Sequence, residues 1–322
     1  MPKTFTDLQR HALSGATMGT RWSALFHMPK GFGTDTVQTA MAAAVAEVDA
    51  QMSTWKPDSD LMRLNAAPVG TWVKLPAQLM TLLAAALEIG RASDGAFDIG
   101  VGDAVTAWGF GSDAANPQRI RAALSAPRRP THEVLDLDPA GLCACKRAEM
   151  MLDLSGIAKG YGVDRLTAVA RGFGIPAALL SIDGELRGYG LQPNGKPWVV
   201  AVEAPNPDER RPAAILDLHD AAVATSGDYR HTIHVGGRDL SHTMDPARGG
   251  PLPESPASVT VLAETCMMAD AWATALMVKG PIEGADLARR MGLNALFFER
   301  QGDGIRQTPV GPLFAEPTKL DA

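Results

Sequence analysis

The sequence predicts an α+β fold. Segments with the period of helices and segments with the alternation of strands follow one another without a regular order, which argues against a strictly alternating βα architecture. The chain has 322 residues, and 32 glycines and 23 prolines against only 6% aromatic residues indicate many turns between short elements rather than a helical bundle. No internal repeat or low-complexity linker marks a boundary. We therefore expect one domain over residues 1–322, with two intertwined lobes as the alternative.

The N-terminal half contains predicted strands and helices in mixed order. Residues 15–26 have the pattern of a short strand, and an alanine-rich segment follows in which apolar residues recur at helical spacing, at Val37, Met41, Val45, Val48 and Met52. Residues 71–75 alternate like a strand, and 77–92 carry a leucine stripe of helical period. Two or three short strands are expected between 131 and 154, including 132–138 and 150–155.

The C-terminal half continues the mixture. Helical spacing predicts helices over 156–171, 266–279 and 285–292. Apolar or alternating runs predict strands at 177–182, 197–203, 213–218, 257–263 and 294–300. Because strand-like sequence lies on both sides of the polar segment 204–212, that segment is expected to be a loop within the domain rather than a linker.

Composition and charge exclude several classes of protein. The 46% hydrophobic residues include no run of 18 or more, so we expect no membrane span. The net charge is −6, and the sequence has no basic run, so nucleic acid is not an expected partner. Cys143, Cys145 and Cys266 fit neither a disulfide framework nor a zinc site. Because the N-terminal segment as written lacks an apolar export signal, we expect a cytoplasmic protein, with an exported protein trimmed of its leader as the alternative.

A first candidate site lies where a predicted strand meets the helix over 156–171. The segment LDLSGIAKGYG, at 152–162, combines a Ser N-cap, glycines and Lys159 at a helix start. Free N–H groups, the helix dipole and a lysine favour a phosphate group there. Since the spacing is neither that of a P-loop nor that of a dinucleotide-binding turn, a structural turn with a surface lysine explains this segment better when it is taken alone.

A second candidate is the pair Asp270 and Thr274 in a predicted helix. Residues four apart lie on one helix face, and a carboxylate with a hydroxyl suits a hard cation such as Mg²⁺. The alternative is an Asp stabilised by the helix dipole and a Thr bonded back to a carbonyl.

Two further segments are rich in polar groups or glycine. His242 lies between two hydroxyl residues in SHTMDP, at 241–246, and is a candidate general base or a structural turn histidine. The glycines of GAFDIGVG, at 95–102, would let a ligand approach the backbone closely, near the aromatic WGFG at 108–111.

Taken in order, these segments resemble the ApbE family of FAD:protein FMN transferases. The resemblance spans about residues 15–280 and rests on nine motifs, which makes it highly specific. They are MGT at 18–20, MSTWKPDSDLMRLN at 52–65, GAFDIGVG at 95–102, WGFG at 108–111, LDLSGIAKGYGVD at 152–164, DGELRGYG at 183–190, ATSGDYR at 224–230, SHTMDP at 241–246 and ADAWATALMVKG at 269–280.

The resemblance implies a T-fold-like α+β enzyme that binds FAD and Mg²⁺, transfers FMN to a Thr or Ser of an acceptor protein and releases AMP. It places magnesium ligands on Asp270, Thr274 and the carbonyl of Gly156, and a base on His242. It places FAD contacts on Met18, Trp55, Ala96, Phe97, Asp98, Asp153, Lys159 and His242. The acceptor would carry a short Thr or Ser flavinylation motif.

Several positions depart from the usual family pattern. Trp55 stands where Tyr is frequent, Gly156 where Ala or Ser is usual, and Asp183 where a GGE triplet begins. Ile99-Gly100 replaces a frequent Pro-Thr. Two other functions are alternatives, and the first of them uses the same residues. They are an FAD pyrophosphatase, in which water replaces the acceptor hydroxyl, and a protein that binds FAD without cleaving it.

Overall fold

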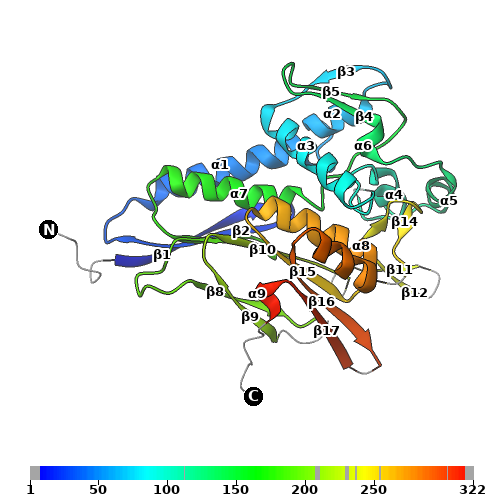
Figure 1. The fold of residues 1–322 in the computed structure, drawn as a ribbon. Coiled ribbons are helices and arrows are strands. Elements are labelled where there is room, and N and C mark those ends of the chain that lie inside the picture. Colours follow the sequence, from blue (N-terminus) through cyan, green and yellow to red (C-terminus); the bar gives the residue numbers. More distant parts are fainter. Residues whose placement is uncertain are drawn as a thin grey trace.

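The computed structural model describes residues 8–315 except 112, 207–210, 229–231, 236–237, 254 and 303. In this part of the chain helices are mixed with antiparallel strands, which confirms the predicted α+β class (Figure 1). Tyr229 and Arg230 of the ATSGDYR motif, and part of the predicted loop 204–212, lie outside the described residues.

An eight-stranded antiparallel sheet forms the body of the molecule. In order across the sheet, its strands are β1 (Leu8–Thr17), β2 (Thr20–Pro29), β6 (Ala178–Ile182), β7 (Glu185–Tyr189), β10 (Ala221–Gly227), β15 (Ser258–Ala263), β16 (Asn294–Gln301) and β17 (Gly304–Val310). Two-residue turns close the β1–β2 and β6–β7 hairpins. Met18 and Gly19 in the first turn and Asp183 in the second adopt the left-handed conformation. The sheet places β7, β10 and β15 side by side although they are far apart in the sequence.

Three helices lie on one face of this sheet: α1 (Thr34–Met52), α7 (Ala158–Gly172) and α8 (Cys266–Arg290) (Figure 1). Trp22 and Phe26 of β2 are fully buried with Met41 of α1. The hairpin of β8 (Trp198–Glu203) and β9 (Pro212–Leu218), with the short α9 (Pro312–Ala315), packs on the other face through Trp198 and Phe298. The sheet is therefore covered on both faces.

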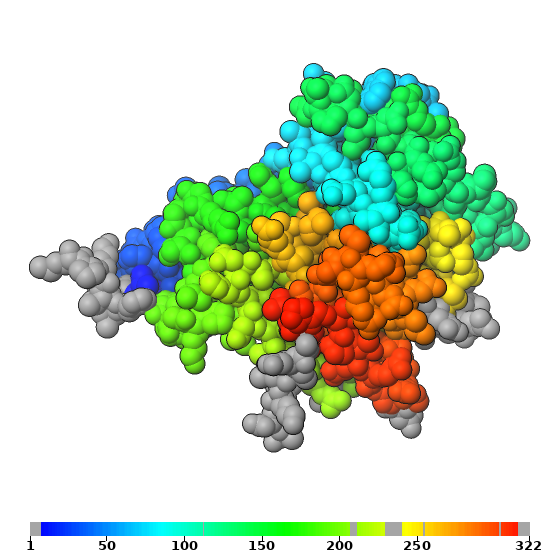
Figure 2. All heavy atoms as spheres, in the orientation of Figure 1, coloured from blue at the N-terminus to red at the C-terminus, as the bar shows by residue number. Residues whose placement is uncertain are grey.

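Residues 53–155 form a small lobe that projects from the body (Figure 2). It contains the helices α2 (Asp60–Ala66), α3 (Ala77–Ala92), α4 (Gly102–Ala107), α5 (Pro117–Ser125) and α6 (Thr131–Val134), and a sheet of β3 (Trp72–Lys74), β4 (Leu135–Asp138) and β5 (Cys143–Lys146). Leu79 and Leu82 of α3 share one buried cluster with Leu276 of α8 and Phe297 of β16. The apolar core thus continues from the small lobe into the body.

Two short hairpins lie between β10 and β15. They are formed by β11 (Thr232–Val235) with β12 (Arg238–Ser241), and by β13 (Met244–Asp245) with β14 (Gly250–Pro251). Met244 packs with Ala104 and Ala107 of α4, so this part of the chain contacts the small lobe. Among the residues described, no helix combines the length and the apolarity needed to cross a membrane.

Some predicted elements were wrong. Residues 150–155 are not a strand, and 132–138 begins as the helix α6 before β4 starts at Leu135. The strand predicted at 15–26 is two strands, because the chain reverses at Met18 and Gly19. By contrast, the two helices predicted at 266–279 and 285–292 are confirmed as the two parts of α8, which the non-helical backbone of Gly280, just before Pro281, separates.

Candidate active site

Helices α7 and α8 approach each other closely at the start of α7. Gly160 makes this possible, because a Cβ atom there would clash with the carbonyl group of Cys266 and would lie 2.8 Å from Cβ of Asp270. The Gly160 N–H donates a 2.9 Å hydrogen bond to Oδ2 of Asp270. This N–H belongs to the first turn of α7, where N–H groups have no partner within the helix. A carboxylate of α8 therefore caps α7.

Thr274 lies one turn after Asp270 and reaches the turn that precedes α7. Its Oγ1 would lie 3.0 Å from a Cβ atom at Gly156, and the ring of Phe97 would lie 3.4 Å from the same atom. Oγ of Ser226, on β10, lies 3.2 Å from Thr274 Oγ1. The structure thus brings together Gly156, Thr274 and Phe97 from segments that are far apart in the sequence, with Asp270 one turn away.

The side chains present fit a hard divalent cation. A buried carboxylate from Asp270, the hydroxyl of Thr274 and the carbonyl of Gly156 are oxygen donors of the kind that Mg²⁺ prefers. In the part of the chain that the structure describes, no group of three or more His, Cys, Asp or Glu side chains is arranged to hold a metal. A cation here would therefore combine one carboxylate with uncharged oxygens from the protein.

The charges around Lys159 leave an excess of negative charge. Its Nζ lies 2.8 Å from Glu185 Oε1 and 3.6 Å from Asp183 Oδ2, and Asp270 is also close enough to interact. One ammonium thus faces three carboxylates, a formal sum of 1 − 3 = −2. Oε2 of Glu185 is buried without a hydrogen-bond partner. Both observations favour a bound cation at this place.

Burial shifts the pKa values of these charged groups. Burial, with a further contribution from Glu185, raises the pKa of Asp270 to about 7. Burial also raises the pKa of Glu185, although Lys159 opposes this. For Lys159, burial alone would lower the pKa, but Glu185 and Asp270 outweigh burial and raise it well above its ordinary value. Lys159 therefore remains charged and compensates its carboxylate neighbours.

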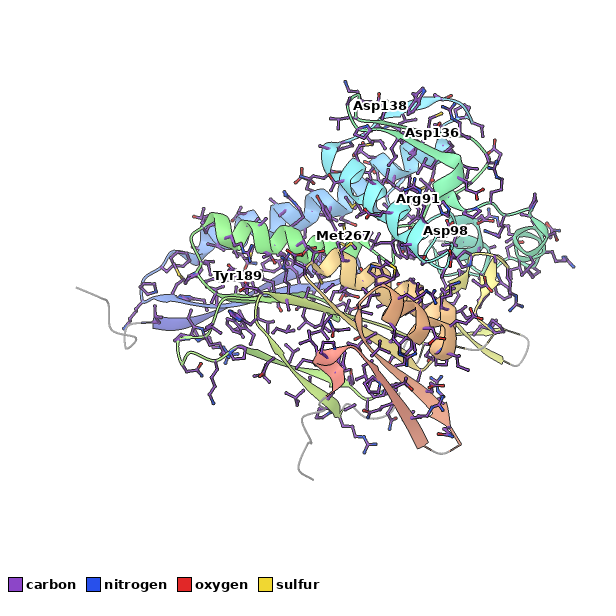
Figure 3. The ribbon with its side chains drawn as sticks, viewed as in Figure 1. Arg91, Asp98, Asp136, Asp138, Tyr189 and Met267 are labelled. Carbon is purple, nitrogen blue, oxygen red and sulfur yellow. The ribbon has the colours of Figure 1, made fainter. Side chains whose placement is uncertain are left out.

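The small lobe contributes the loop Ala96–Phe97–Asp98 and the segment around Asp153. Ala96 and Phe97 are buried, and Asp98 accepts hydrogen bonds from the N–H of Gly100 at 2.7 Å and from both the N–H and the hydroxyl of Thr131. The N–H of Asp153 donates to the carbonyl of Ile99 at 2.7 Å, which joins the two segments. Asp98 lies on the small lobe facing the body (Figure 3). Burial raises the pKa of Asp153.

The remaining predicted site residues lie on other segments of the chain. Met18, in the β1–β2 turn, is half-buried, and its Cε would lie 3.1 Å from a Cβ atom at Gly162 of α7. The ring of His242 lies edge-on to the ring of Phe110 in the small lobe, at 6.3 Å between centroids. Trp55 is 64% exposed, so it lies at the surface, where it could stack on a ligand from one side.

Three residues of the site were not predicted as functional: Glu185, Ser226 and Asn65. All three lie in motifs that were identified, but the strand positions of Glu185 and Ser226 gave no sign of their partners on α7 and α8. Asn65 bonds both backbone groups of Leu152, at 2.8 and 3.0 Å, and so holds the segment that leads to Asp153 and Gly156. Only the fold shows that an amide near the end of α2 faces this segment.

Comparisons with known proteins point to one family. The model of the ApbE family matches residues 18–297. The FAD:protein FMN transferase of Vibrio cholerae is 36% identical over 299 residues, 92% of this chain and 89% of that protein. The Salmonella typhimurium protein of the same name is 33% identical over 308 residues, covering 94% and 87% of the two chains.

Solved structures show the same similarity. The apo form of the Pseudomonas stutzeri flavinyl transferase ApbE superposes with a TM-score of 0.84 and 34% identity, over 97% of this chain and 98% of that one. The flavin transferase ApbE from Vibrio cholerae superposes with a TM-score of 0.83 and 33% identity, over 94% and 97%.

Proposed function

The chain belongs to the ApbE family, and from this premise we propose that it transfers the FMN portion of FAD to a threonine or serine hydroxyl of an acceptor protein and releases AMP. The observation that carries the proposal is the similarity, over almost the whole chain, to proteins named FAD:protein FMN transferase. The arrangement of Asp270, Thr274 and Gly156 where α7 meets α8 supports it.

The metal ligands in this proposal are Asp270, Thr274 and the carbonyl of Gly156. When bound, Mg²⁺ would polarise the diphosphate and stabilise the charge that develops on the leaving AMP. Asp270 supplies the one anionic ligand, and the Gly160 N–H holds its second oxygen in place. The positive charge of Lys159 offsets part of the negative charge of the buried carboxylates. Because an ammonium has three N–H donors, the bond from Lys159 to Glu185 leaves other donors for a phosphate oxygen.

The base in this proposal is His242. The hydroxyl oxygen of the acceptor forms a new bond to the phosphorus of the FMN phosphate, and the bond from this phosphorus to the oxygen of AMP breaks. His242 accepts the proton of the attacking hydroxyl. General-base catalysis of this kind raises the rate by about 10²–10⁴. Phe110 borders the imidazole on one side. No oxidant or reductant takes part, and the flavin passes to the acceptor unchanged.

The remaining contacts with FAD are proposed for residues of both lobes. Met18 and Lys159 would contact FAD from the body, and Trp55, Ala96, Phe97, Asp98 and Asp153 from the small lobe. Asp98 and Asp153 already accept hydrogen bonds from backbone N–H groups, so their carboxylates are held in fixed directions. We propose that they orient the ribityl, ribose or adenine groups rather than move protons.

The test is incubation of the protein with FAD and Mg²⁺, with and without an acceptor that carries a Thr or Ser flavinylation motif. AMP release and the intact mass of the acceptor are measured together. We expect a mass gain equal to covalent FMN with an equimolar amount of AMP. AMP with free FMN and an unmodified acceptor would show a pyrophosphatase instead, and bound FAD without either product would show a binding protein. Both results would overturn the proposal.

A further inference from the structure

We propose that Asp164 and Arg187 are positioning residues that hold α8 in place against α7. They keep Asp270 and Thr274 at the position along α7 that the metal site requires. This inference rests on the proposed function. It concerns two residues that lie outside the predicted metal and FAD contacts. Asp164 is on α7, and Arg187 is on β7.

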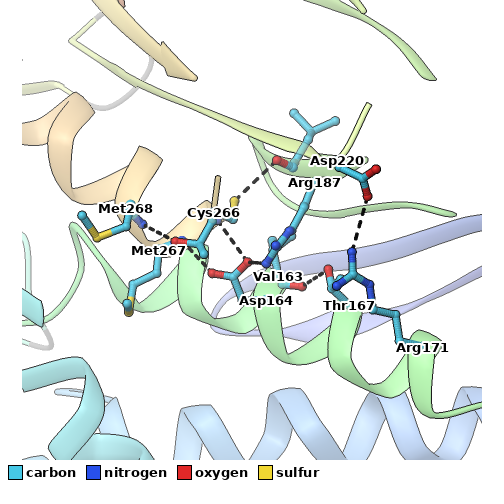
Figure 4. A network of polar contacts seen from close by, with 11 residues as sticks. Val163, Asp164, Thr167, Arg171, Arg187, Asp220, Cys266, Met267 and Met268 are labelled. Carbon is cyan, nitrogen blue, oxygen red and sulfur yellow. Dashed lines mark hydrogen bonds and ion pairs between the residues drawn. The ribbon is translucent and has the colours of Figure 1, made fainter. Parts of the chain in front are cut away.

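Asp164 caps the N-terminus of α8 from the neighbouring helix. Its Oδ1 accepts the N–H of Cys266 at 3.0 Å, and its Oδ2 accepts the N–H of Met267 at 2.9 Å (Figure 4). These are the first two residues of α8, whose N–H groups have no partner within the helix. Thr265 caps the same end by accepting the N–H of Met268. The carboxylate of Asp164 thus fixes the start of α8 to the side of α7.

Arg187 holds Asp164 in this position. Its Nη1 lies 2.5 Å from Asp164 Oδ1, and both side chains are largely buried, at 14% and 15% exposure. Burial raises the pKa of Asp164, whereas the two backbone N–H groups and Arg187 favour its charged form. The pair therefore joins three elements, α7, α8 and the sheet, through one carboxylate.

The two helices cap each other. Asp164 of α7 accepts N–H groups at the start of α8, and Asp270 of α8 accepts the N–H of Gly160 at the start of α7. Asp270 lies one turn after Cys266, and Gly160 lies one turn before Asp164, so the two links are adjacent. A slide of α8 along α7 would break both links. Such a slide would also move Thr274 away from Gly156, which would separate two of the proposed metal donors.

The test compares Asp164→Asn with wild type and with Asp220→Asn. Asp220 is a matched control, because its carboxylate also pairs with an arginine, Arg171 of α7, at 3.5 Å. Unlike Asp164, however, Asp220 is 57% exposed (Figure 4). Binding of Mn²⁺ in the presence of FAD is followed by electron paramagnetic resonance, at a temperature where circular dichroism shows each variant folded.

We expect Asp164→Asn to raise the half-saturating Mn²⁺ concentration about tenfold or more, as is usual when a group that orients metal ligands is lost. Transfer should recover at high Mg²⁺, so the loss appears in the metal requirement and not in the maximal rate. Asp220→Asn should match wild type. An Asp164→Asn protein that is less stable but binds Mn²⁺ as wild type does would overturn the inference, because the pair would then serve the fold alone.

Arg187→Lys is a second variant in case Asp164→Asn does not fold. It keeps the positive charge but loses the planar guanidinium, and we expect a smaller shift of Mn²⁺ binding in the same direction. Unchanged Mn²⁺ binding in a folded Arg187→Lys protein would remove Arg187 from the inference. If wild type itself binds no Mn²⁺ with FAD, the proposed function fails first, so the two failures are distinguishable.

Discussion

Among single residues, the proposed chemistry depends most on the buried carboxylate of Asp270. Replacement by Asn keeps the size of the side chain and an acceptor for the Gly160 N–H, but it removes the anionic ligand. Metal stabilisation of a developing charge is worth several kcal/mol, so we expect transfer to fall by about 10²-fold or more. We expect the variant to fold, because the substitution removes one of the negative charges that lie close together around Lys159.

AMP release and circular dichroism would measure both effects of Asp270→Asn. Asp286→Asn, on the exposed side of α8, is the control that should change neither. Wild-type turnover in Asp270→Asn would exclude Asp270 as the metal ligand.

Substitution of His242 tests its proposed role as the general base. With His242→Ala, we expect FAD affinity to change little and transfer to fall by about 10²–10⁴, the usual contribution of a general base. FAD binding is measured by flavin fluorescence and transfer by the mass of the acceptor. If FAD binding is lost while the rate per bound FAD is unchanged, His242 is a binding contact and not a base.

Tyr189 provides a pH-dependent test of the packing of β7. Its hydroxyl is buried and donates to the carbonyl of Ile175 at 2.9 Å, and burial raises its pKa to about 12. The folded pKa lies above the ordinary value of 10, so this contribution to stability is complete below pH 10 and is lost as the pH rises towards 12.

We expect the absorbance at 295 nm to show a tyrosinate component near pH 12 that is missing in Tyr189→Phe. If the component missing in Tyr189→Phe instead titrates near pH 10, the phenol of Tyr189 is not protected in the folded state.

At the scale of elements, the contact between α7 and α8 depends on a missing side chain. Gly160→Ala would place Cβ 2.7 Å from the carbonyl carbon of Cys266, and backbone cannot move aside as a flexible side chain would. We expect a loss of about 3 kcal/mol in the free energy of unfolding, at the upper end for overpacking. The metal requirement should also rise, because Asp270 lies beside the same glycine.

Gly172→Ala is the control within the same helix. Nothing lies within 4 Å of a Cβ atom there, so we expect a gain of about 0.5 kcal/mol from reduced backbone freedom in the unfolded chain. Urea unfolding of both variants measures the difference. A Gly160→Ala protein as stable as Gly172→Ala would mean that the two helices are not packed as tightly as the structure shows.

The sequence predicted those elements whose period was strong. The stripes on α1, α3 and α7 have a helical period because each of these helices buries one face, and the predicted helices agree within a few residues. Most of strand β1 was not predicted, because its residues are mostly polar or small and it lies at the edge of the sheet. Residues 150–155 have the alternation of a strand, but Asn65 bonds Leu152 and occupies its backbone groups.

At the scale of the whole molecule, the sequence indicated candidate residues for the site but not the charge balance around Lys159. Asp270 and Thr274 four apart on one helix could be recognised from their spacing. The partners of Lys159 could not, because Glu185 reaches it only through the pairing of β6 with β7 and the packing of α7 on the sheet. For the same reason, no sequence pattern could indicate that Asp164 caps a helix that begins about 100 residues later.

The proposed site includes residues of both the small lobe and the body, so we expect FAD and a divalent cation to stabilise the whole chain. One buried cluster includes Leu79 and Leu82 of the small lobe with Leu276 and Phe297 of the body, and we therefore expect a single thermal transition. A ligand at 100 times its dissociation constant adds about 2.7 kcal/mol. In a chain of this size, that corresponds to a rise in Tm of about 5 °C.

The shift should depend on both ligands, because the proposed metal ligands and FAD contacts meet where Gly156, Thr274 and Phe97 converge. We expect FAD with Mg²⁺ to raise Tm by more than the sum of FAD alone and Mg²⁺ alone, since each ligand improves the affinity of the other. Asp270→Asn should keep the shift with FAD and lose the extra rise with Mg²⁺. Additive shifts in wild type would mean that the cation and FAD bind at independent places, and the metal site would then have to be sought away from the junction of α7 and α8.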